Sequence, residues 1–270
     1  MKKRILSLLL CLTVLLSLSS FAFAADAAPV FWVDGEAVSD PGMEVCNQIT
    51  YVSLYNVVPA LRPDATVCWS DGQAVVAASG LNITARPGNQ YIEANGRYLY
   101  VLYGVKVADG HVLVPVRSIA QAMDACVGWN AATGAVEIYK GNGTIPSGNS
   151  FYDTDAVCWL SHIINAESGN QPMDGKIAVG TVVLNRVSDP RFPDTIYGVI
   201  FQVNQFTPVS NGAIYNTPNE ESIIAAKLCL EGVRICGSSL YFVNASVSPN
   251  SWAQRNRPYV ATIGAHSFFA

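Results

Sequence analysis

An apolar stripe on one predicted helix ends at a single carboxylate. Val157, Leu160, Ile163 and Ile164 fall on one face of a helical wheel, and Glu167 lies on that same face. Because charged side chains are rarely buried unless they are paired, a glutamate in this stripe is unusual. Burial in apolar surroundings raises a carboxyl pKa toward neutrality, as a general acid requires. The alternative is a glutamate at a frayed helix end that turns to solvent.

The next segment, residues 175–187, predicts a helix that is buried on most sides. Its apolar residues surround most of the circumference: Ile177, Val179, Val182, Val183, Leu184 and Val187. A helix that is apolar all round belongs in a core. We expect Asp174 to cap this helix, and Asn185 and Arg186 at its end need polar partners.

Later elements predict a mainly helical second half with a small β element. Thr217-Pro-Asn-Glu220 predicts a capping box at the start of a helix that ends near Gly232. Residues 239–243 and 259–263 predict short strands. Helices around a core with a small β element on one side make an α+β domain.

The first half contains an internal two-fold repeat and predicts a mixed α and β domain. Residues 51–61 and 65–69 are echoed by residues 113–123 and 125–129. Each copy predicts a short strand, a helix and a second strand that opens at a Val-x-Trp element. Three segments between the copies alternate like edge strands: residues 81–85, 90–94 and 98–101.

Residues 141–150 predict a flexible connection, because glycine, serine, asparagine, threonine and proline make up nine of the ten residues there. We therefore expect a repeat domain over residues 25–140 and a second domain over residues 151–270.

The first residues have the three parts of a secretory signal peptide. Three basic residues after Met1 precede an apolar run from Ile5 to Leu18, and an Ala22-Phe-Ala24 cleavage site follows. The run is too short to span a bilayer comfortably. We therefore expect residues 1–24 to be removed and the chain to be secreted, without stable membrane insertion. An uncleaved membrane anchor is the alternative.

Charge and cysteine content narrow the function classes. A formal net charge of -4, with only 13% charged residues, argues against a nucleic-acid partner. Six cysteines follow the predicted signal peptide: Cys46, Cys68, Cys126, Cys158, Cys229 and Cys236. Three lie in each half, so at least one disulfide would join the halves if all six were paired. The pairing itself stays open. The chain has no C-x-x-C pair and its three histidines are scattered, so we expect no structural zinc.

Six separated blocks in the second half form a specific pattern. They are Asn165-Ala-Glu-Ser-Gly169, Asn185-Arg186, Gln205-Phe-Thr-Pro-Val209, Tyr215-Asn-Thr-Pro-Asn-Glu-Glu221, Ser239-Leu-Tyr-Phe-Val-Asn244, and Arg257-Pro258 with Ile263-Gly-Ala-His-Ser-Phe268. Over residues 151–270 they closely resemble the catalytic domain of spore cortex-lytic enzymes and related bacterial cell wall hydrolases. The resemblance implies a lysozyme-like fold, cleavage of peptidoglycan glycan strands and a catalytic glutamate at Glu167. Germination-specific members of the family act as lytic transglycosylases.

The repeat of the first half, with its Val114-Pro-Val-Arg117 and Trp129-Asn130 elements, resembles the copper amine oxidase N-terminal-like domain of secreted Gram-positive proteins. The name does not imply copper, because no histidine or cysteine ligand set occurs here, and we expect no metal or cofactor. The resemblance implies a module that attaches the chain to the wall or to an accessory protein.

Glycan cleavage needs a proton for the leaving oxygen and stabilisation of an oxocarbenium-like transition state. Asp174, Asp189, Asp194 and Glu220 are weak candidates for a second carboxylate, because helix starts and turns explain them better. The lack of an obvious second carboxylate fits a mechanism that uses one carboxylate. Glu167 would act first as acid and then as base, while the substrate's acetamido group or the muramic acid C6 hydroxyl serves as nucleophile. The resemblance implies an anhydromuramoyl product.

Three alternatives stay open. One is a hydrolytic muramidase or glucosaminidase with water as the nucleophile, and another is a non-enzymatic wall-binding protein. The third is a cysteine peptidase that uses Cys158 with His162 or His266. The sequence leaves open whether the target is spore cortex or vegetative wall.

A sugar-binding cleft also needs rings for stacking and amides for hydroxyl groups. The candidates for substrate contact are Gln205, Phe206, Asn211, Tyr215, Tyr241, Phe242 and Asn244. Ordinary core packing is the alternative for each aromatic residue. Gln205 and Tyr241 are preferred because of their place in the matching blocks. Arg257 and His266 are expected to be structural ties near the C-terminus.

Overall fold

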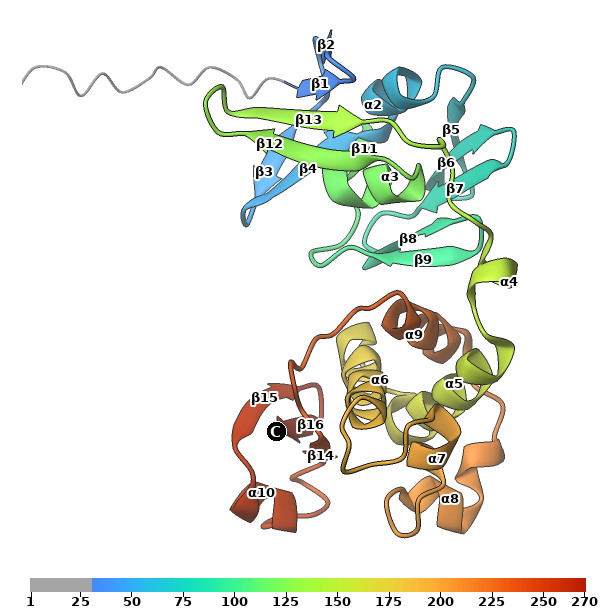
Figure 1. The fold of residues 1–270 in the computed structure, drawn as a ribbon, viewed down its shortest axis with the longest axis vertical. Coiled ribbons are helices and arrows are strands. Elements are labelled where there is room, and N and C mark those ends of the chain that lie inside the picture. The colour runs from blue at the N-terminus through green and yellow to red at the C-terminus, as the bar shows by residue number, and fades with distance from the viewer. Residues whose placement is uncertain (1–30) are drawn as a thin grey trace, which may run out of the picture.

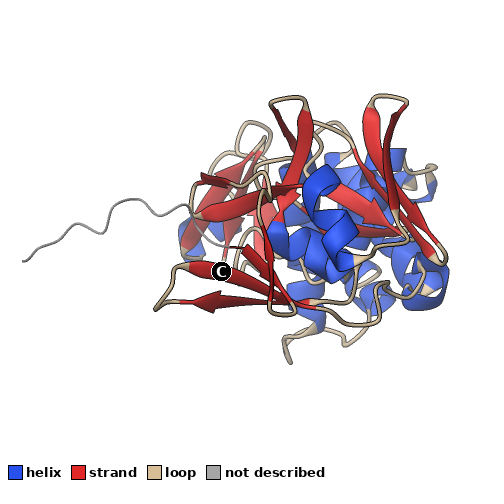
Figure 2. Ribbon diagram, turned by 90° about the horizontal axis from the view of Figure 1, so that it is seen from above, coloured by secondary structure: helices blue, strands red, loops and turns tan. Residues whose placement is uncertain are grey.

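The computed structural model describes residues 31–270, which form two bodies (Figure 1). The N-terminal body is built mainly of strands and the C-terminal body mainly of helices, so the chain has the mixed α and β content that we predicted. Figure 2 shows both kinds of element from above. The predicted signal peptide lies outside the described residues.

Three sheets and two helices build the N-terminal domain. The elements are β1 (Phe31–Val33), β2 (Glu36–Val38), β3 (Glu44–Cys46), β4 (Ile49–Ser53), α2 (Leu54–Leu61), β5 (Thr66–Ser70), β6 (Gln73–Ala78), β7 (Leu81–Ala85), β8 (Tyr91–Ala94), β9 (Arg97–Tyr100), β10 (Lys106–Ala108), β11 (His111–Pro115), α3 (Val116–Ala122), β12 (Cys126–Asn130) and β13 (Ala135–Tyr139). The strand orders are β12-β13-β1-β2, β10-β11-β4-β3 and β5-β6-β7-β8-β9.

The two similar segments of the first half fold in the same order, as a strand, a helix and a second strand. They are β4-α2-β5 and β11-α3-β12. β4 and β11 pair antiparallel with Val52 opposite Val114, and both valines are fully buried. Both helices follow these central strands directly, so their apolar faces reach one shared core.

Strands β7, β8 and β9 form where the alternating pattern predicts strands. The turn between β8 and β9 consists of Asn95 and Gly96, with φ values of 52° and 81°. Positive φ at both positions is the requirement of a two-residue type I′ hairpin, which asparagine and glycine tolerate best. This hairpin matters because it faces the C-terminal domain.

Residues 141–150, predicted as a flexible connection, make specific contacts with the N-terminal domain. Ile145 lies in the core of that domain, and its carbonyl accepts a hydrogen bond of 3.0 Å from Asn95 Nδ2. The amide of Gly148 donates to the Asn95 carbonyl over 2.8 Å. The carbonyl of Gly143 accepts from Arg62 over 3.0 Å. The segment is therefore held along the hairpin and the α2 end of this domain. The domain boundaries themselves stay a prediction.

The C-terminal domain packs three longer helices against short elements. Its elements are α4 (Gly148–Phe151), α5 (Thr154–Ser168), α6 (Met173–Val187), α7 (Ile196–Ile200), α8 (Thr207–Asn211), the 3-10 turn η1 (Ala213–Tyr215), α9 (Glu220–Leu230), β14 (Tyr241–Val243), α10 (Trp252–Asn256), β15 (Tyr259–Ile263) and β16 (His266–Phe269). The three strands form one sheet in the order β14-β16-β15.

Helix α6 is the buried central helix that its pattern predicts, and glycine lets its neighbours approach closely. A Cβ atom on Gly180 would lie 2.7 Å from Sγ of Cys229 on α9 and 2.9 Å from Cδ1 of Ile164 on α5. Both distances are shorter than normal van der Waals contact, so the three helices meet at a point where a side chain does not fit.

Two predicted helix starts are wrong. Pro172 occupies the N-cap of α6, while Asp174 lies in its first turn and binds the N-terminal domain. Asn219 caps α9 by accepting a hydrogen bond of 2.8 Å from the Ser222 amide, so Thr217 does not form the predicted capping box. Asparagine is among the strongest N-cap residues, and here it stands two positions closer to the helix than the threonine does.

A buried ion pair joins the two domains. Arg97 of β9 donates from Nε and Nη2 to the two carboxylate oxygens of Glu231, over 2.8 and 2.7 Å. The side chains are only 11% and 4% exposed. The hydroxyl of Tyr152 also donates to Glu231, and the ring of Phe151 covers the guanidinium at 3.5 Å. This geometry is bidentate, which fixes orientation as well as distance.

A second contact ties the β8–β9 hairpin to the start of α6. Oδ1 of Asp174 accepts hydrogen bonds of 2.9 Å from Nε2 of Gln90 and from the hydroxyl of Tyr100. The ring of Tyr98, also on β9, lies 5.1 Å from the ammonium of Lys227 on α9. The N-terminal domain thus reaches the helix that follows Glu167 in the chain.

The six cysteines of residues 31–270 are free thiols in the structure, without the disulfide between the halves that complete pairing would require. None of the helices in this part of the chain combines the length and the apolar character needed to cross a membrane.

Candidate active site

Glu167 lies in the last turn of α5, on the apolar face that the sequence predicts. Asp153 caps the start of this helix by accepting a hydrogen bond of 2.7 Å from the Ala156 amide. Ile163 and Ile164 on the same helix are fully buried and hold it against the core. Glu167 itself is half-buried at the end of the stripe.

Burial raises the pKa of Glu167 from 4.5 to about 7, and no neighbouring charge contributes to this change. Its carboxyl group forms no hydrogen bond within residues 31–270. The buried polar atoms without a hydrogen-bond partner are Oε1 of Gln202, Nε of Arg257 and Nδ1 of His266, so the Glu167 oxygens are not fully buried. Both oxygens must therefore reach solvent. At neutral pH such a group exists partly as the acid and partly as the base, as proton transfer in both directions requires.

The loop after Glu167 is fixed from the side of α9. Oδ1 of Asn165 accepts hydrogen bonds from the Asn219 amide, over 3.1 Å, and from the Ser222 hydroxyl, over 3.4 Å. Nδ2 of Asn219 in turn donates to the carbonyl of Gly169 over 3.0 Å. The residues on both sides of the glutamate are thus bound to the same helix start.

The opposite side of this loop is fixed by the small sheet and by a buried lysine. Oε1 of Gln171 accepts a hydrogen bond of 2.8 Å from the Ala265 amide, in the turn between β15 and β16. Lys176, whose side chain is 1% exposed, donates to the carbonyl of Gln171 and to Glu221. Glu167 therefore stands on a segment held by α9, by α6 and by the sheet.

Arg186 at the end of α6 organises a second cluster. Its Nε donates to the carbonyl of Leu240 over 2.7 Å, and its Nη1 donates to Oε1 of Gln205 over 3.3 Å. The rings of Phe206 and Tyr241 lie 5.2 and 5.5 Å from the guanidinium. Burial lowers the pKa of Arg186 to about 10, and no carboxylate among the described residues pairs with it.

Tyr241 continues this cluster toward the surface. Its hydroxyl accepts a hydrogen bond of 3.3 Å from Nη2 of Arg257, whose guanidinium lies 4.9 Å from both the Tyr241 and Trp252 rings. The Trp252 ring is 52% exposed and meets Tyr241 edge to face. Tyr241 thus joins a buried guanidinium to an exposed aromatic surface.

The structure brings only some of the predicted substrate-binding residues together. Gln205, Phe206 and Tyr241 surround Arg186, and Phe242 packs between Phe206 and His266. The other three form no hydrogen bond with this cluster within residues 31–270: Asn211 and Asn244 accept bonds in local turns, and Tyr215 on η1 is 65% exposed. Burial of Phe206 in the core favours a packing role for it, and the substrate contacts of all seven remain predictions.

Sequence reasoning gave no role to Lys176 or Trp252. The signal for Lys176 is a lysine in the first half of α6, directly before the apolar run, which is unusual because lysine is rarely buried without a partner. The signal for Trp252 is the S-x-x-Q pattern from Ser251 to Gln254, which forms the capping box of α10 and places the indole at the helix start.

The weak candidates for a second carboxylate are engaged or exposed. Asp174 binds the N-terminal domain, and Asp189 forms a bidentate pair with Arg191. Asp194 and Glu220 are both exposed. None of them contributes to the raised pKa of Glu167.

Within residues 31–270 no hydrogen bond joins the thiol of Cys158 to the imidazole of His162 or of His266. Nδ1 of His162 lies 2.6 Å from the carbonyl of Ile214 and is bound there, while Cys158 is exposed. Nδ1 of His266 is buried without a partner, and Nε of Arg257 is likewise unpartnered. No set of three or more metal-binding side chains comes together within residues 31–270.

Comparisons with known proteins agree with the two halves. Residues 170–269 match the family model of the cell wall hydrolases, and residues 32–138 match that of the copper amine oxidase N-terminal domain. Both resemblances drawn from the sequence are thereby confirmed.

Several named proteins are similar to the second half. The spore cortex-lytic enzyme of Bacillus cereus is 36% identical over 124 residues, which cover 46% of this chain and 46% of the relative. The enzyme of that name from Bacillus subtilis is 34% identical over 117 residues, covering 43% and 38%. The chain spans about half or less of the length of these curated relatives.

A solved structure is similar to the same part of the chain. It is the catalytic domain of a germination-specific lytic transglycosylase from Bacillus anthracis, which is 35% identical. The match covers 47% of this chain and 100% of that one, with a TM-score of 0.42.

Proposed function

We propose that this chain, whose second half carries a cell wall hydrolase domain, cleaves the glycan strands of peptidoglycan with Glu167 as its single general acid and base. The observation that carries the proposal is the position of Glu167 at the end of the buried face of α5, where burial raises its pKa and no residue of 31–270 forms an ion pair with it. The match of residues 170–269 to the cell wall hydrolases supports cleavage of the wall, and it begins three residues after Glu167. We propose a lysozyme-like fold for this domain.

The proposed reaction uses the glutamate twice. Protonated Glu167 donates its proton to the glycosidic oxygen as the bond to the sugar breaks. The C6 hydroxyl of the muramic acid residue then attacks its own anomeric carbon, with or without prior help from the acetamido oxygen, and ionised Glu167 takes the hydroxyl proton. The products are a sugar with a free hydroxyl group and a 1,6-anhydromuramoyl end. No water is consumed, and the carboxyl group returns to its starting state.

The cluster around Arg186 is the proposed sugar-binding surface. Gln205 uses its carbonyl oxygen for Arg186, which leaves its amide nitrogen to donate to a sugar hydroxyl. Tyr241 and Trp252 offer ring faces and edges next to Arg257. Arg257, which forms no ion pair within residues 31–270, suits a polymer that carries lactyl and peptide carboxylates.

The reaction is tested by the ends of the released fragments. Mass spectrometry of muropeptides from purified peptidoglycan should show anhydromuramoyl ends, 18 Da lighter than the corresponding reducing ends, and Glu167→Gln should release almost none. Reducing ends would indicate a hydrolytic muramidase or glucosaminidase with water as nucleophile. Absence of any cleavage by the parent would favour the non-enzymatic wall-binding alternative. Loss of cleavage in Cys158→Ser, with Glu167→Gln active, would favour a thiol enzyme.

The site of action and the role of the first half follow from the same proposal. We propose that the signal peptide directs the chain out of the cell, and that the secreted protein acts on cell wall or spore cortex. The N-terminal domain, matched over residues 32–138, serves attachment and is a two-fold repeat in which β4-α2-β5 corresponds to β11-α3-β12. The pairing of Val52 with Val114 at the centre of β4 and β11 supports this correspondence.

A further inference from the structure

The N-terminal domain exposes two tryptophans at corresponding positions. Trp69 of β5 and Trp129 of β12 are 60% and 61% exposed, and each is the fourth residue of its strand. Each indole stands opposite a small or branched apolar residue of the next strand, Ala74 and Val136 respectively. Tryptophan is among the residues that are most enriched at the centres of binding sites.

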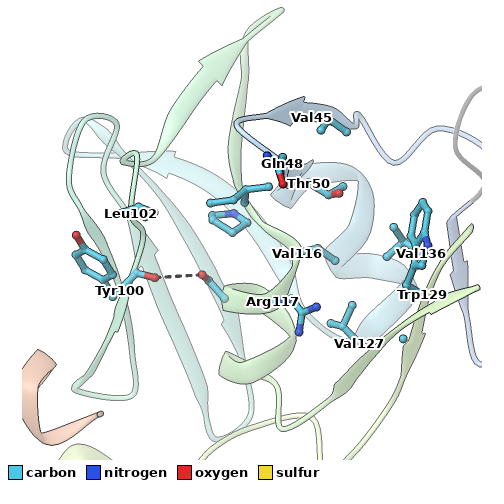
Figure 3. Close-up of a pocket in the computed structure, with 14 residues that line it drawn as sticks. Val45, Gln48, Thr50, Tyr100, Leu102, Val116, Arg117, Val127, Trp129 and Val136 are labelled. Atoms are coloured by element: carbon cyan, nitrogen blue, oxygen red, sulfur yellow. Dashed lines mark hydrogen bonds between the residues drawn. The ribbon is translucent and has the colours of Figure 1, made fainter. Parts of the chain in front are cut away.

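Each tryptophan borders an open groove. The groove beside Trp129 has a volume of about 540 Å³ and is shown in Figure 3. The groove beside Trp69 has a volume of about 340 Å³. We call them groove 1 and groove 2. Their size and their mainly apolar lining fall in the range of small-molecule sites.

The two grooves are built from corresponding parts of the repeat. Groove 1 combines Thr50 of β4 with Val116 and Arg117 at the start of α3. Groove 2 combines Val112 of β11 with Leu54 and Tyr55 at the start of α2. In groove 1 the first copy supplies the β3–β4 hairpin, and the second copy supplies the start of α3 and strand β12, which carries Trp129. In groove 2 the second copy supplies the β10–β11 turn, and the first copy supplies the start of α2 and strand β5, which carries Trp69. The antiparallel pair of β4 and β11 produces this exchange, because it relates the two copies by a local two-fold axis.

The polar groups in these grooves suit a sugar polymer. Arg117 is the charged residue that lines groove 1, and it forms no ion pair within residues 31–270. In groove 2, Nδ1 of His111 is 3.0 Å from the hydroxyl of Ser53 and its ring meets Tyr55 edge to face. Indole faces pack against the C–H faces of pyranose rings, and a free guanidinium attracts carboxylate substituents. A protein partner would need a larger continuous apolar surface than these two separate grooves offer.

Groove 1 also extends to the joint between the domains. Tyr100 and Leu102 line one end of it. The carbonyl of Tyr100 accepts a weak hydrogen bond from Ser118, drawn in Figure 3, while the hydroxyl of the same residue donates to Asp174 on α6. A polymer lying in groove 1 would therefore lead to the helix that follows Glu167 in the chain.

We propose that the N-terminal domain binds peptidoglycan glycan strands in grooves 1 and 2, with Trp69 and Trp129 as the stacking platforms. The identity of this polymer rests on the function proposed above, whereas the two binding grooves do not. Two equivalent sites on one domain allow two strands, or two stretches of one strand, to be held together. The second binding event is then intramolecular, which raises the overall affinity above that of one groove.

The test measures binding separately from cleavage. The full chain with Glu167→Gln is mixed with insoluble purified peptidoglycan, and the protein left in solution gives the dissociation constant. Trp69→Ala and Trp129→Ala should each weaken binding about 2- to 10-fold, the range expected from the loss of one aromatic contact. The double variant should weaken it about 10- to 100-fold. Tyr103→Ala, an aromatic residue that is 48% exposed and lines neither groove, is the matched control.

The outcomes separate this proposal from the proposed function. In chains that keep Glu167, the two tryptophan substitutions should leave cleavage of short soluble glycan fragments unchanged. A double variant that is folded, with a melting temperature near that of the parent, and that binds as the parent does would overturn the groove proposal. A double variant that shifts a self-association equilibrium in sedimentation would also overturn it, because the grooves would then contact a second copy. Binding that depends on both tryptophans, in a chain that cleaves nothing, would support the grooves and refute the catalytic proposal.

Discussion

Glutamine at position 167 removes a titratable group but keeps the shape of the side chain, so its effect on stability depends on pH. Burial raises the pKa of Glu167 to about 7 in the folded chain, against 4.5 for an ordinary glutamate. Between these values the folded chain holds a proton that the unfolded chain releases. The free energy of unfolding of the parent therefore falls as the pH rises through this window. Below it, Glu167 and its glutamine substitute are both neutral in both states.

The size of the effect follows from the two pKa values. The difference between the folded and unfolded pKa values corresponds to about 3 kcal/mol, since a shift of one pKa unit is equivalent to about 1.36 kcal/mol. Solvent reaches the carboxyl oxygens and screens part of this cost, so we expect a difference of about 1–3 kcal/mol. At pH 8 the Glu167→Gln variant should be more stable than the parent by this amount, and at pH 4 the two should be equal.

Catalysis should change in the opposite direction. General acid–base catalysis contributes about 10²–10⁴-fold. Because no carboxylate within residues 31–270 influences the pKa of Glu167, we expect the loss in the glutamine variant at the upper end of that range. In the parent, kcat/KM should fall about tenfold per pH unit above pH 7, because the fraction of protonated Glu167 falls by that factor.

Urea unfolding at pH 4 and pH 8 measures the stability difference, and muropeptide release from purified peptidoglycan measures the activity. Glu36→Gln, at an exposed glutamate of β2, is the matched control and should change neither quantity. A folded Glu167→Gln protein that keeps more than about a tenth of the parent rate would refute the assignment of this residue as the acid. A variant that is less stable than the parent at pH 8 would refute the argument from burial.

Three further substitutions test the framework around the site. Gly180→Ala should lower the free energy of unfolding by about 1–3 kcal/mol in chemical denaturation, because the added methyl group would collide with Cys229. Gly232→Ala is the control: no atom lies near its added methyl group, so only the strain of its positive φ should affect stability. Lys176→Met should lower the cleavage rate about 10-fold or more with a smaller change in KM, since misplacement of a catalytic group is costly and the ammonium fixes the loop after Glu167. Arg97→Ala should destabilise the chain by about 3–5 kcal/mol in denaturation and should open the joint between the domains to limited proteolysis, because it leaves Glu231 buried without its cation.

The periodic elements of the chain were predictable because a local pattern decides them. The apolar stripe of α5, the all-round apolar character of α6 and the alternating strands β7 to β9 each follow from side chains within one element. Caps were less predictable because neighbouring residues compete for one position. Both Thr217 and Asn219 are good caps, and in the structure Asn219 takes the position.

Contacts between elements that are distant in sequence could not be predicted from pattern. Asp174 looks like a helix starter in the sequence, yet it binds Gln90 and Tyr100, which precede it by 84 and 74 residues. The sequence shows Arg186 only as a charge that needs partners, and the fold supplies Gln205 and the Leu240 carbonyl. A raised pKa at Glu167 was predictable because burial alone causes it, and burial follows from the helical stripe.

The joint between the domains shows why removing one residue and removing a whole domain have different consequences. Arg97→Ala leaves Glu231 enclosed by Tyr152 and by the N-terminal domain, so its carboxylate loses a cation without regaining water. A fragment that begins at Ser150 loses Arg97 together with the surface that encloses Glu231, and the carboxylate returns to solvent. Asp174 is released in the same way. The fragment should therefore fold alone and cleave soluble glycan fragments, while binding insoluble peptidoglycan less tightly than the full chain. An insoluble or unfolded fragment would show that residues 151–270 are not an independent domain.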